Sequence, residues 1–164
     1  MAPLADRPCA VVDLDGTVAD VRHRLRFLER RPRDWAGFFA AADDDPVLPE
    51  GRAVVARLVA EEHEIVWLTG RPERCRTATV AWLGRHGLPA GPLHMRRDDD
   101  RRPARFTKVA VLRQLARTRS VAVVVDDDVL VVQAVRAAGF PVLHADWMAA
   151  QPTLFSAQET DGRT

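Results

Sequence analysis

The sequence has almost no lysine, very little cysteine and no long apolar stretch. Its two cysteines, Cys9 and Cys75, are too few for a disulfide framework, which favours a reducing cytoplasm. Apolar runs reach at most about eight residues, whereas a membrane-spanning helix needs about 20. The start of the chain also lacks the apolar segment of a secretory signal. We therefore expect a cytoplasmic protein without a membrane-spanning segment.

The sequence also lacks an excess of charge of either sign. The net charge of +1 over 164 residues gives no overall electrostatic case for nucleic-acid binding. Of the 24 basic residues, 23 are arginine, so the single lysine, Lys108, marks a place that needs a compact ammonium rather than a planar guanidinium. A Walker A loop requires Gly-Lys followed by Ser or Thr, but Lys108 follows Thr107, which excludes a P-loop kinase.

Short β-branched runs alternate with helical patterns along most of the chain. Apolar runs predict strands at 9–14, 64–68, 93–95, 121–125 and 140–143. Helical spacing predicts helices over 21–30, 35–42, 50–61, 73–86, 106–117 and 129–138. Continuous apolar strands that alternate with helices are typical of a parallel sheet covered on both faces. We expect an α/β fold with a leader over 1–8, one domain over 9–148 with a short helical insert at 21–48, and a flexible tail over 149–164.

Three of the predicted strands end in polar residues. These ends read Asp13-Leu14-Asp15-Gly16-Thr17, Thr69-Gly70-Arg71 and Asp126-Asp127-Asp128. Taken singly, each could be an ordinary turn or a solvated acidic loop. In an open parallel sheet, however, the carboxyl ends of strands meet at one crevice, and adjacent acids repel one another unless a cation such as Mg²⁺ is held between them. Carboxylates, a hydroxyl, a metal and the nearby Lys108 would together suit phosphoryl transfer.

The order of these residues resembles the four motifs of the haloacid dehalogenase (HAD) superfamily, over roughly residues 9 to 148. The resemblance implies a three-layer Rossmann-like core and a phosphoric monoester hydrolase. It implies that Asp13 attacks phosphorus and forms an aspartyl phosphate, and that Asp15 acts as the general acid and base. Thr69 would donate to the phosphoryl oxygens, and Lys108 would offset charge between the nucleophile and the phosphate.

The same resemblance implies a Mg²⁺ cofactor and an open site. Its ligands would be Asp13, the main-chain carbonyl of Asp15, Asp126 and Asp127. An acid at the position of Asp15 favours phosphatases and mutases over dehalogenases within the superfamily. Only about 33 residues separate the first motif from the helix expected at 50–61, which is too few for a large cap domain.

Finer details resemble the 3′-phosphatase domain of phage-type polynucleotide kinases. That domain has an arginine nine residues after the second aspartate, here Arg24, and another directly after the Thr-Gly pair, here Arg71. The resemblance implies that Arg24, Gly70 and Arg71 bind the substrate phosphate. The alternatives are a solvated helix charge for Arg24 and a surface turn for Arg71. Where that family often has an acid, four residues before the lysine, this chain has Ala104.

Two further segments have open interpretations. The arginines between Arg96 and Arg102 could follow a nucleic-acid backbone, or they could form a charged loop balanced by Asp98–Asp100. One of these three acids could also take the role of the acid that the family often has at the position of Ala104. The aromatic residues Trp35, Phe38 and Phe39 could stack on a base or, as we favour, pack on the core.

Three functions remain in competition on the sequence alone. The first is removal of 3′-phosphates from DNA or RNA ends during repair, with a separate kinase or ligase chain as partner because no kinase motif is present. The second is hydrolysis of a small phosphate ester by a nucleotidase-like HAD phosphatase. The third is a catalytically dead HAD fold that binds nucleic acid or protein. The third is disfavoured because all the motif residues are in place.

Overall fold

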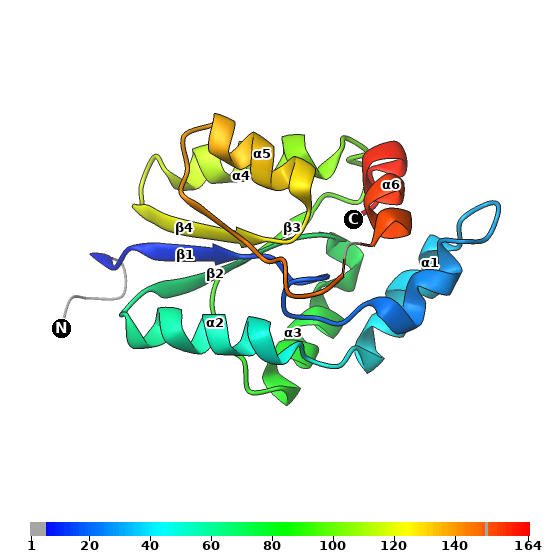
Figure 1. Cartoon of the computed structure of the whole chain (residues 1–164), viewed down its shortest axis with the longest axis horizontal. Coiled ribbons are helices and arrows are strands. Elements are labelled where there is room, and N and C mark those ends of the chain that lie inside the picture. The colour runs from blue at the N-terminus through cyan, green and yellow to red at the C-terminus, as the bar shows by residue number, and fades with distance from the viewer. Residues whose placement is uncertain (1–5, 150) are drawn as a thin grey trace.

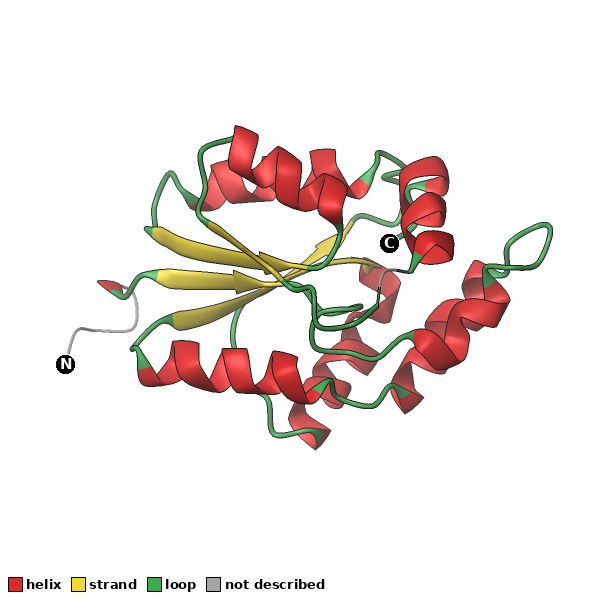
Figure 2. Cartoon of the chain, viewed as in Figure 1, coloured by secondary structure: helices red, strands yellow, loops and turns green. Residues whose placement is uncertain are grey.

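Five parallel strands form the centre of the molecule, in the order β3-β2-β1-β4-β5 (Figures 1 and 2). The computed structural model describes residues 6–149 and 151–164, so most of the expected leader lies outside it. The strands are β1 (Cys9–Val12), β2 (Glu64–Pro72), β3 (Leu93–Arg96), β4 (Val121–Asp126) and β5 (Val142–His144). In the middle of the sheet, Val12 of β1 is in register with Trp67 on β2 and Val125 on β4.

Helices cover both faces of this sheet, as continuous apolar strands require (Figure 2). They are α2 (Pro49–Ala60) and α3 (Arg76–Arg85) on one face, and α4 (Ala104–Leu115) and α5 (Val129–Ala137) on the other. Alternate residues of β1 serve the two layers: Ala10 and Val12 pack with α2 and α3, whereas Cys9 and Val11 pack with α4 and α5. The expected three-layer α/β fold is thereby confirmed.

The insert between β1 and α2 is small and helical. It contains η2 (Arg22–Phe27), α1 (Trp35–Ala40) and η3 (Ala41–Asp44), and no large cap domain is present among the described residues. The helix expected at 21–30 is instead a short 3₁₀ helix, and the aromatic side chains Trp35, Phe38 and Phe39 pack into a cluster of their own. These aromatics are therefore largely core residues, as favoured.

The expected flexible tail is wrong, because residues 152–161 form a helix, α6 (Pro152–Asp161), that completes the aromatic cluster of the insert (Figure 1). Leu154 and Ala157 are fully buried there. The Asp161 carboxylate also accepts hydrogen bonds from Arg33 (3.0 Å) and from the Trp35 indole (2.9 Å). The apolar face of α6 is short and finds its partner more than 100 residues away, which local composition does not reveal.

No helix in residues 6–149 and 151–164 combines the length and the apolar character needed to cross a lipid bilayer.

Candidate active site

Asp13 and Asp15 lie just beyond the central strand β1, where the carboxyl ends of β1, β2 and β4 meet. Both side chains are buried, at 6% and 3% exposure, so neither is an ordinary surface turn acid. Gly16 makes the turn that places them. Its φ of +80° is a left-handed conformation, and a Cβ there would lie 2.1 Å from the Asp127 carboxylate. Only glycine allows the loops after β1 and β4 to approach so closely.

Three buried carboxylates gather on one side of this turn. Asp13, Asp126 and Asp127 each offer an oxygen, and these oxygens all lie within 4.8 Å of one another. The Thr17 hydroxyl lies 3.2 Å from Asp13 Oδ2 and 3.4 Å from Asp127 Oδ1. Burial and the negative charge of Asp126 raise the pKa of Asp13 to about 7, although Lys108 opposes the shift. Three buried carboxylates that crowd their hard oxygen donors together fit a divalent cation such as Mg²⁺.

Lys108 reaches this cluster from the second turn of α4. Its ammonium donates to Asp13 Oδ1 at 2.9 Å and to Asp126 Oδ2 at 2.6 Å, and the side chain is almost fully buried. Burial alone would lower the pKa of Lys108, but the charges of Asp126 and Asp13 outweigh it and raise the pKa. The lysine is therefore a fixed cation beside the carboxylate of Asp13.

Asp15 points to the opposite side, where two arginines hold one of its oxygens. Asp15 Oδ1 accepts from Arg24 Nη2 (2.9 Å) and from Arg71 Nε (3.0 Å) and Nη2 (2.6 Å). The charges of Arg24 and Arg71 overcome the effect of burial and lower the pKa of Asp15. Asp15 Oδ2 is buried and has no hydrogen-bond partner within the described part of the chain. One oxygen is thus anchored while the other is available to a reacting group.

Asp45, which the sequence analysis missed, joins the two arginines from the insert. It accepts from Arg24 Nε at 2.8 Å and Nη2 at 2.7 Å, and lies 3.3 Å from Arg71 Nη2. His23 contacts the same carboxylate at 2.7 Å. Asp45 is the last acid of a run before Pro46, which looks like any loop in sequence. No local pattern shows that it is the side chain that folds inward.

A family model for the phosphatase domain of polynucleotide kinase PNKP matches residues 7–147. The chain belongs to this family. The two aspartates after β1, Thr69, Lys108 and the acid pair at the end of β4 all lie within the matched residues. No curated protein matches the chain.

Solved structures share the fold of this PNKP-type phosphatase domain. A chain of the Pnkp1/Rnl/Hen1 complex matches with a TM-score of 0.71 and 22% identity, over 85% of this chain. The match spans only 46% of that chain, so this protein corresponds to less than half of it. The class C acid phosphatase from Bacillus anthracis matches with a TM-score of 0.63 and 17% identity, over 87% of this chain and 68% of its own.

Arg24 and Arg71, which we expected to bind the substrate phosphate, are buried rather than exposed at an open phosphate site. Arg24 is completely buried rather than solvated, and its guanidinium lies 4.1 Å from the centre of the Phe38 ring. Arg71 is also buried and additionally donates to Thr79 at 3.3 Å. Asp15 and Asp45 both accept hydrogen bonds from the guanidinium groups of Arg24 and Arg71. In this PNKP-type domain their N–H groups are directed mainly at carboxylates.

Motif two contributes Thr69 and Gly70 at the end of β2. The Thr69 hydroxyl accepts from the Arg71 main-chain N–H at 3.1 Å, which fixes its oxygen while leaving its proton free to donate. A Cβ at Gly70 would lie 2.0 Å from the main-chain carbon of Thr164. The glycine is therefore required for the close approach of the segment after α6, whatever its contact with substrate.

The loop before α4 fits the charged-loop interpretation in part, because Arg97 pairs with Asp99 and Arg102 pairs with Asp100. Arg96 is buried and donates to main-chain carbonyls of Gly70 and Arg102, so it holds the loop together. Asp98–Asp100 interact with arginines and not with Lys108, so they do not replace the acid missing at Ala104. Ala104 is instead part of the apolar layer under α4. The acids that pair with Lys108 are instead Asp13, just after β1, and Asp126, at the end of β4.

Proposed function

We propose that this PNKP-type domain is a Mg²⁺-dependent phosphomonoesterase that acts through an aspartyl phosphate and removes 3′-phosphates from nucleic-acid ends. The observation that carries the chemistry is the opposite setting of two aspartates only two residues apart. Asp13 lies with a fixed ammonium and two further acids, whereas Asp15 is anchored by one oxygen and free at the other. A nucleophile and a proton carrier need such different surroundings.

The first step transfers the phosphoryl group to the protein. A carboxylate oxygen of Asp13 forms the new bond to phosphorus while the bond between phosphorus and the leaving oxygen breaks. Because Arg24 and Arg71 keep Asp15 ionised, the proton enters on the phosphate of a monoanionic ester, passes to the unpartnered Oδ2 of Asp15 and from there to the leaving oxygen. Thr69 donates its free hydroxyl proton to the phosphoryl oxygens, and Lys108 offsets the charge between Asp13 and the phosphate.

The second step restores the enzyme. A water molecule attacks phosphorus, its proton passes to Asp15, and the bond between Asp13 and phosphorus breaks to release inorganic phosphate. Asp13, Asp126 and Asp127 would hold Mg²⁺ with the main-chain carbonyl of Asp15, since their buried oxygens crowd together. When bound, the ion supplies positive charge that neutralises these acids and the phosphoryl oxygens.

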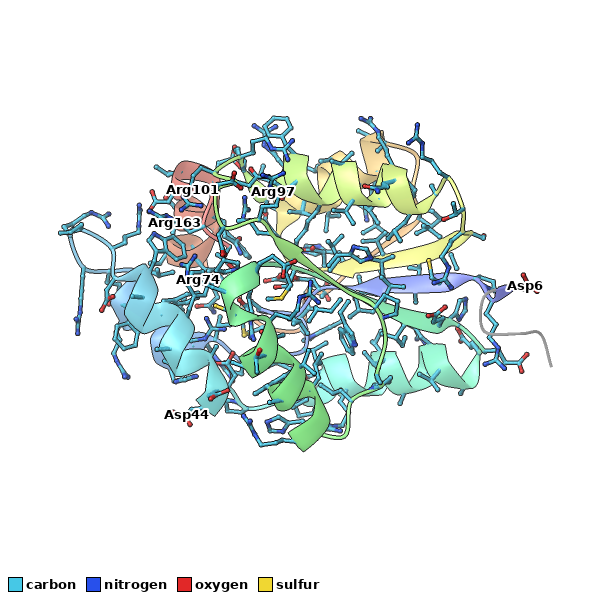
Figure 3. The ribbon with its side chains drawn as sticks, turned by 180° about the vertical axis from the view of Figure 1, so that it is seen from behind. Asp6, Asp44, Arg74, Arg97, Arg101 and Arg163 are labelled. Atoms are coloured by element: carbon cyan, nitrogen blue, oxygen red, sulfur yellow. The ribbon has the colours of Figure 1, made fainter. Side chains whose placement is uncertain are left out.

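Three arginines beside the site support a nucleic-acid substrate. Arg74, Arg101 and Arg163 come from segments far apart in the sequence but lie on the same side of the molecule (Figure 3). Arg101 and Arg163 line the same surface pocket, and Arg74 is labelled close to them in the same view. Arg74 pairs with Asp98, whereas Arg101 and Arg163 form no salt bridge within residues 6–149 and 151–164, and such unpaired cations suit a phosphodiester backbone.

The match to a Pnkp1 complex supports a proposal about the partner chains of this activity. The matched Pnkp1 structure is a complex with Rnl and Hen1. We infer that a separate kinase or ligase chain supplies the other steps of end repair. The two free cysteines, one of them buried, agree with a cytoplasmic location.

The direct test compares substrates at one salt concentration. We expect a higher kcat/KM for 3′-phosphorylated oligonucleotides than for 5′-phosphorylated ones, mononucleotides or an aryl phosphate. Arg101→Ala and Arg163→Ala should weaken oligonucleotide turnover and reduce its dependence on salt. The matched control is Arg117→Ala, since Arg117 is exposed at the opposite end of α4.

Two outcomes would change this assignment. Efficient hydrolysis of mononucleotides, with no salt-sensitive effect of Arg101 or Arg163, would leave a small-molecule HAD phosphatase. An inactive protein that still binds 3′-phosphorylated ends in Mg²⁺ would support the binding-module alternative instead.

A further inference from the structure

A cleft lined by small side chains opens beside the catalytic acid. It lies between the insert and the start of α3, has a volume of about 420 Å³, and includes four alanines: Ala36, Ala40, Ala42 and Ala78. Ligand pockets have volumes of about 300–1,000 Å³, so this cleft has the size of a small-molecule site. The alanines keep it open, because larger side chains at these places would occupy it.

The side chain of Arg71 lies between this cleft and Asp15. Its Nε and Nη2 donate to Asp15 Oδ1 at 3.0 Å and 2.6 Å, and its Nη1 donates at 3.3 Å to Thr79, which lines the cleft. The space is therefore one guanidinium group away from the carboxylate that would protonate the leaving oxygen.

The cleft also contains a group that recognises a flat ring. Phe39 lines it, but this ring is 8% exposed and stacks on Trp35, so the group that a base would meet is the exposed Arg74 guanidinium, 5.5 Å from the centre of the Phe39 ring. An aromatic ring and an arginine are the side chains on which bases stack in single-stranded nucleic acids. Asp43 adds an exposed carboxylate at the cleft, which can accept from an amino group.

We propose that this alanine-lined cleft binds the base of the 3′-terminal nucleotide, the nucleotide whose phosphate is removed. The inference rests on the proposed 3′-phosphatase activity and adds a base subsite to it. The leaving oxygen belongs to the sugar that carries this base, so a phosphate on Asp13 and a leaving oxygen at Asp15 direct the base past Arg71. Arg74 lies at both the cleft and the basic surface, where the next phosphodiester follows.

The test compares two oligonucleotides that differ only at the 3′ end, one with an intact terminal nucleotide and one with an abasic residue carrying the same 3′-phosphate. We expect the intact end to be preferred in kcat/KM by about 5- to 150-fold, the contribution of stacking one base. Ala78→Leu fills the cleft and should remove most of this preference. Ala81→Leu, an exposed site one turn further along α3 outside the cleft, is the matched control and should retain it.

A second variant guards against a folding defect in the first. Phe39→Leu keeps an apolar side chain but removes the ring beside the Arg74 guanidinium, and thermal unfolding shows whether each variant is folded. An unchanged preference in both folded variants, or no preference for an intact end in the wild type, would overturn the base subsite. If Ala78→Leu instead impaired binding of a protein partner alone, the cleft would be a protein site and the inference would be wrong.

The outcomes also separate this inference from the proposed function. If 3′-phosphorylated oligonucleotides are poor substrates with and without the terminal base, the 3′-phosphatase proposal itself fails. If they are good substrates and the base makes no difference, only the subsite fails. Titration of the Asp13→Asn variant with 5′-fluorescent forms of the two oligonucleotides gives the same comparison as binding, free of turnover.

Discussion

Two aspartates separated by a single leucine have opposite chemical surroundings in this protein. Asp13 lies among acids, with one ammonium between them, and burial and Asp126 raise its pKa to about 7. Asp15 lies between two arginines, which lower its pKa despite equal burial. Residues two apart in a strand point to the same side, so it is the departure from strand geometry after Val12, at the turn containing Gly16, that delivers one carboxylate to each environment.

The comparison shows that burial alone does not decide how a carboxylate behaves. On the acid-rich side, negative charge is in excess and a cation would relieve it. On the arginine side, Asp15 and Asp45 together balance Arg24 and Arg71. The acid-rich side is thus incomplete without an ion, whereas the arginine side is complete within the protein.

The largest effect that separates the two sides should come from Asp13→Asn. This change keeps the shape of the side chain but removes the nucleophile, so turnover of every phosphate ester should fall by several orders of magnitude. Steady-state rates on an oligonucleotide and an aryl phosphate measure it, with circular dichroism as the check on folding. Near-normal turnover by pure Asp13→Asn would exclude the aspartyl-phosphate mechanism.

Lys108→Arg should have the next largest effect, although the charge is kept. The wider, planar guanidinium does not fit between Asp13 and Asp126, where the ammonium makes contacts of 2.9 Å and 2.6 Å. We expect kcat/KM to fall by about 100- to 1,000-fold, as for loss of a group that stabilises developing charge. Arg113→Lys on the exposed face of α4 is the control. Wild-type rates in Lys108→Arg would mean that charge alone is needed there.

Asp45→Asn should break the balance on the arginine side. Removing one acid leaves two buried guanidinium groups with Asp15 alone, and such a loss costs about 3–5 kcal/mol of the free energy of unfolding. Denaturant unfolding measures this cost, and Asp43→Asn, an exposed acid of the same run, should cost almost nothing. A stability unchanged by Asp45→Asn would show that the four charges do not act as one unit.

The smallest effect concerns pH and Mg²⁺ on the acid-rich side. Asp13 and Asp127 both have raised pKa values in the folded protein, so they bind protons more tightly there than in the unfolded chain. The contribution of Asp13 to stability is complete below the ordinary pKa of 3.8 and is lost as pH rises through about 7, and that of Asp127 is lost in the same direction. The melting temperature of the metal-free protein should therefore fall by a few degrees from pH 5 to pH 8.

Added Mg²⁺ should reverse this loss, and more strongly at pH 8 than at pH 5, because the ion binds the ionised carboxylates. Asp127→Asn should raise the melting temperature of the metal-free protein at pH 8 and weaken the response to Mg²⁺. Equal shifts by Mg²⁺ at both pH values, measured by scanning calorimetry, would contradict a carboxylate cage at this place.

The sequence by itself determined the sheet and the edge at which the proposed site residues meet. The apolar runs of β1, β2 and β4 dictate parallel strands, and because such strands end at one edge, Asp13, Thr69 and Asp126 had to meet there. The lone lysine was also readable, since a composition that otherwise uses arginine makes Lys108 stand out. These inferences succeed because strand periodicity and motif spacing are local properties of the chain.

Only the tertiary structure decided the use of the arginines, Asp45 and α6. Arg24 and Arg71 were expected at a phosphate, yet their strongest contacts are with Asp15 and with an acid 21 residues beyond Arg24 in the sequence. The aromatic cluster of the insert is likewise closed by a helix more than 100 residues away. Charge pairs and apolar contacts between distant segments have no characteristic spacing in the sequence, because any two segments that pack together can form them. Which pairs form is therefore decided only by the tertiary structure.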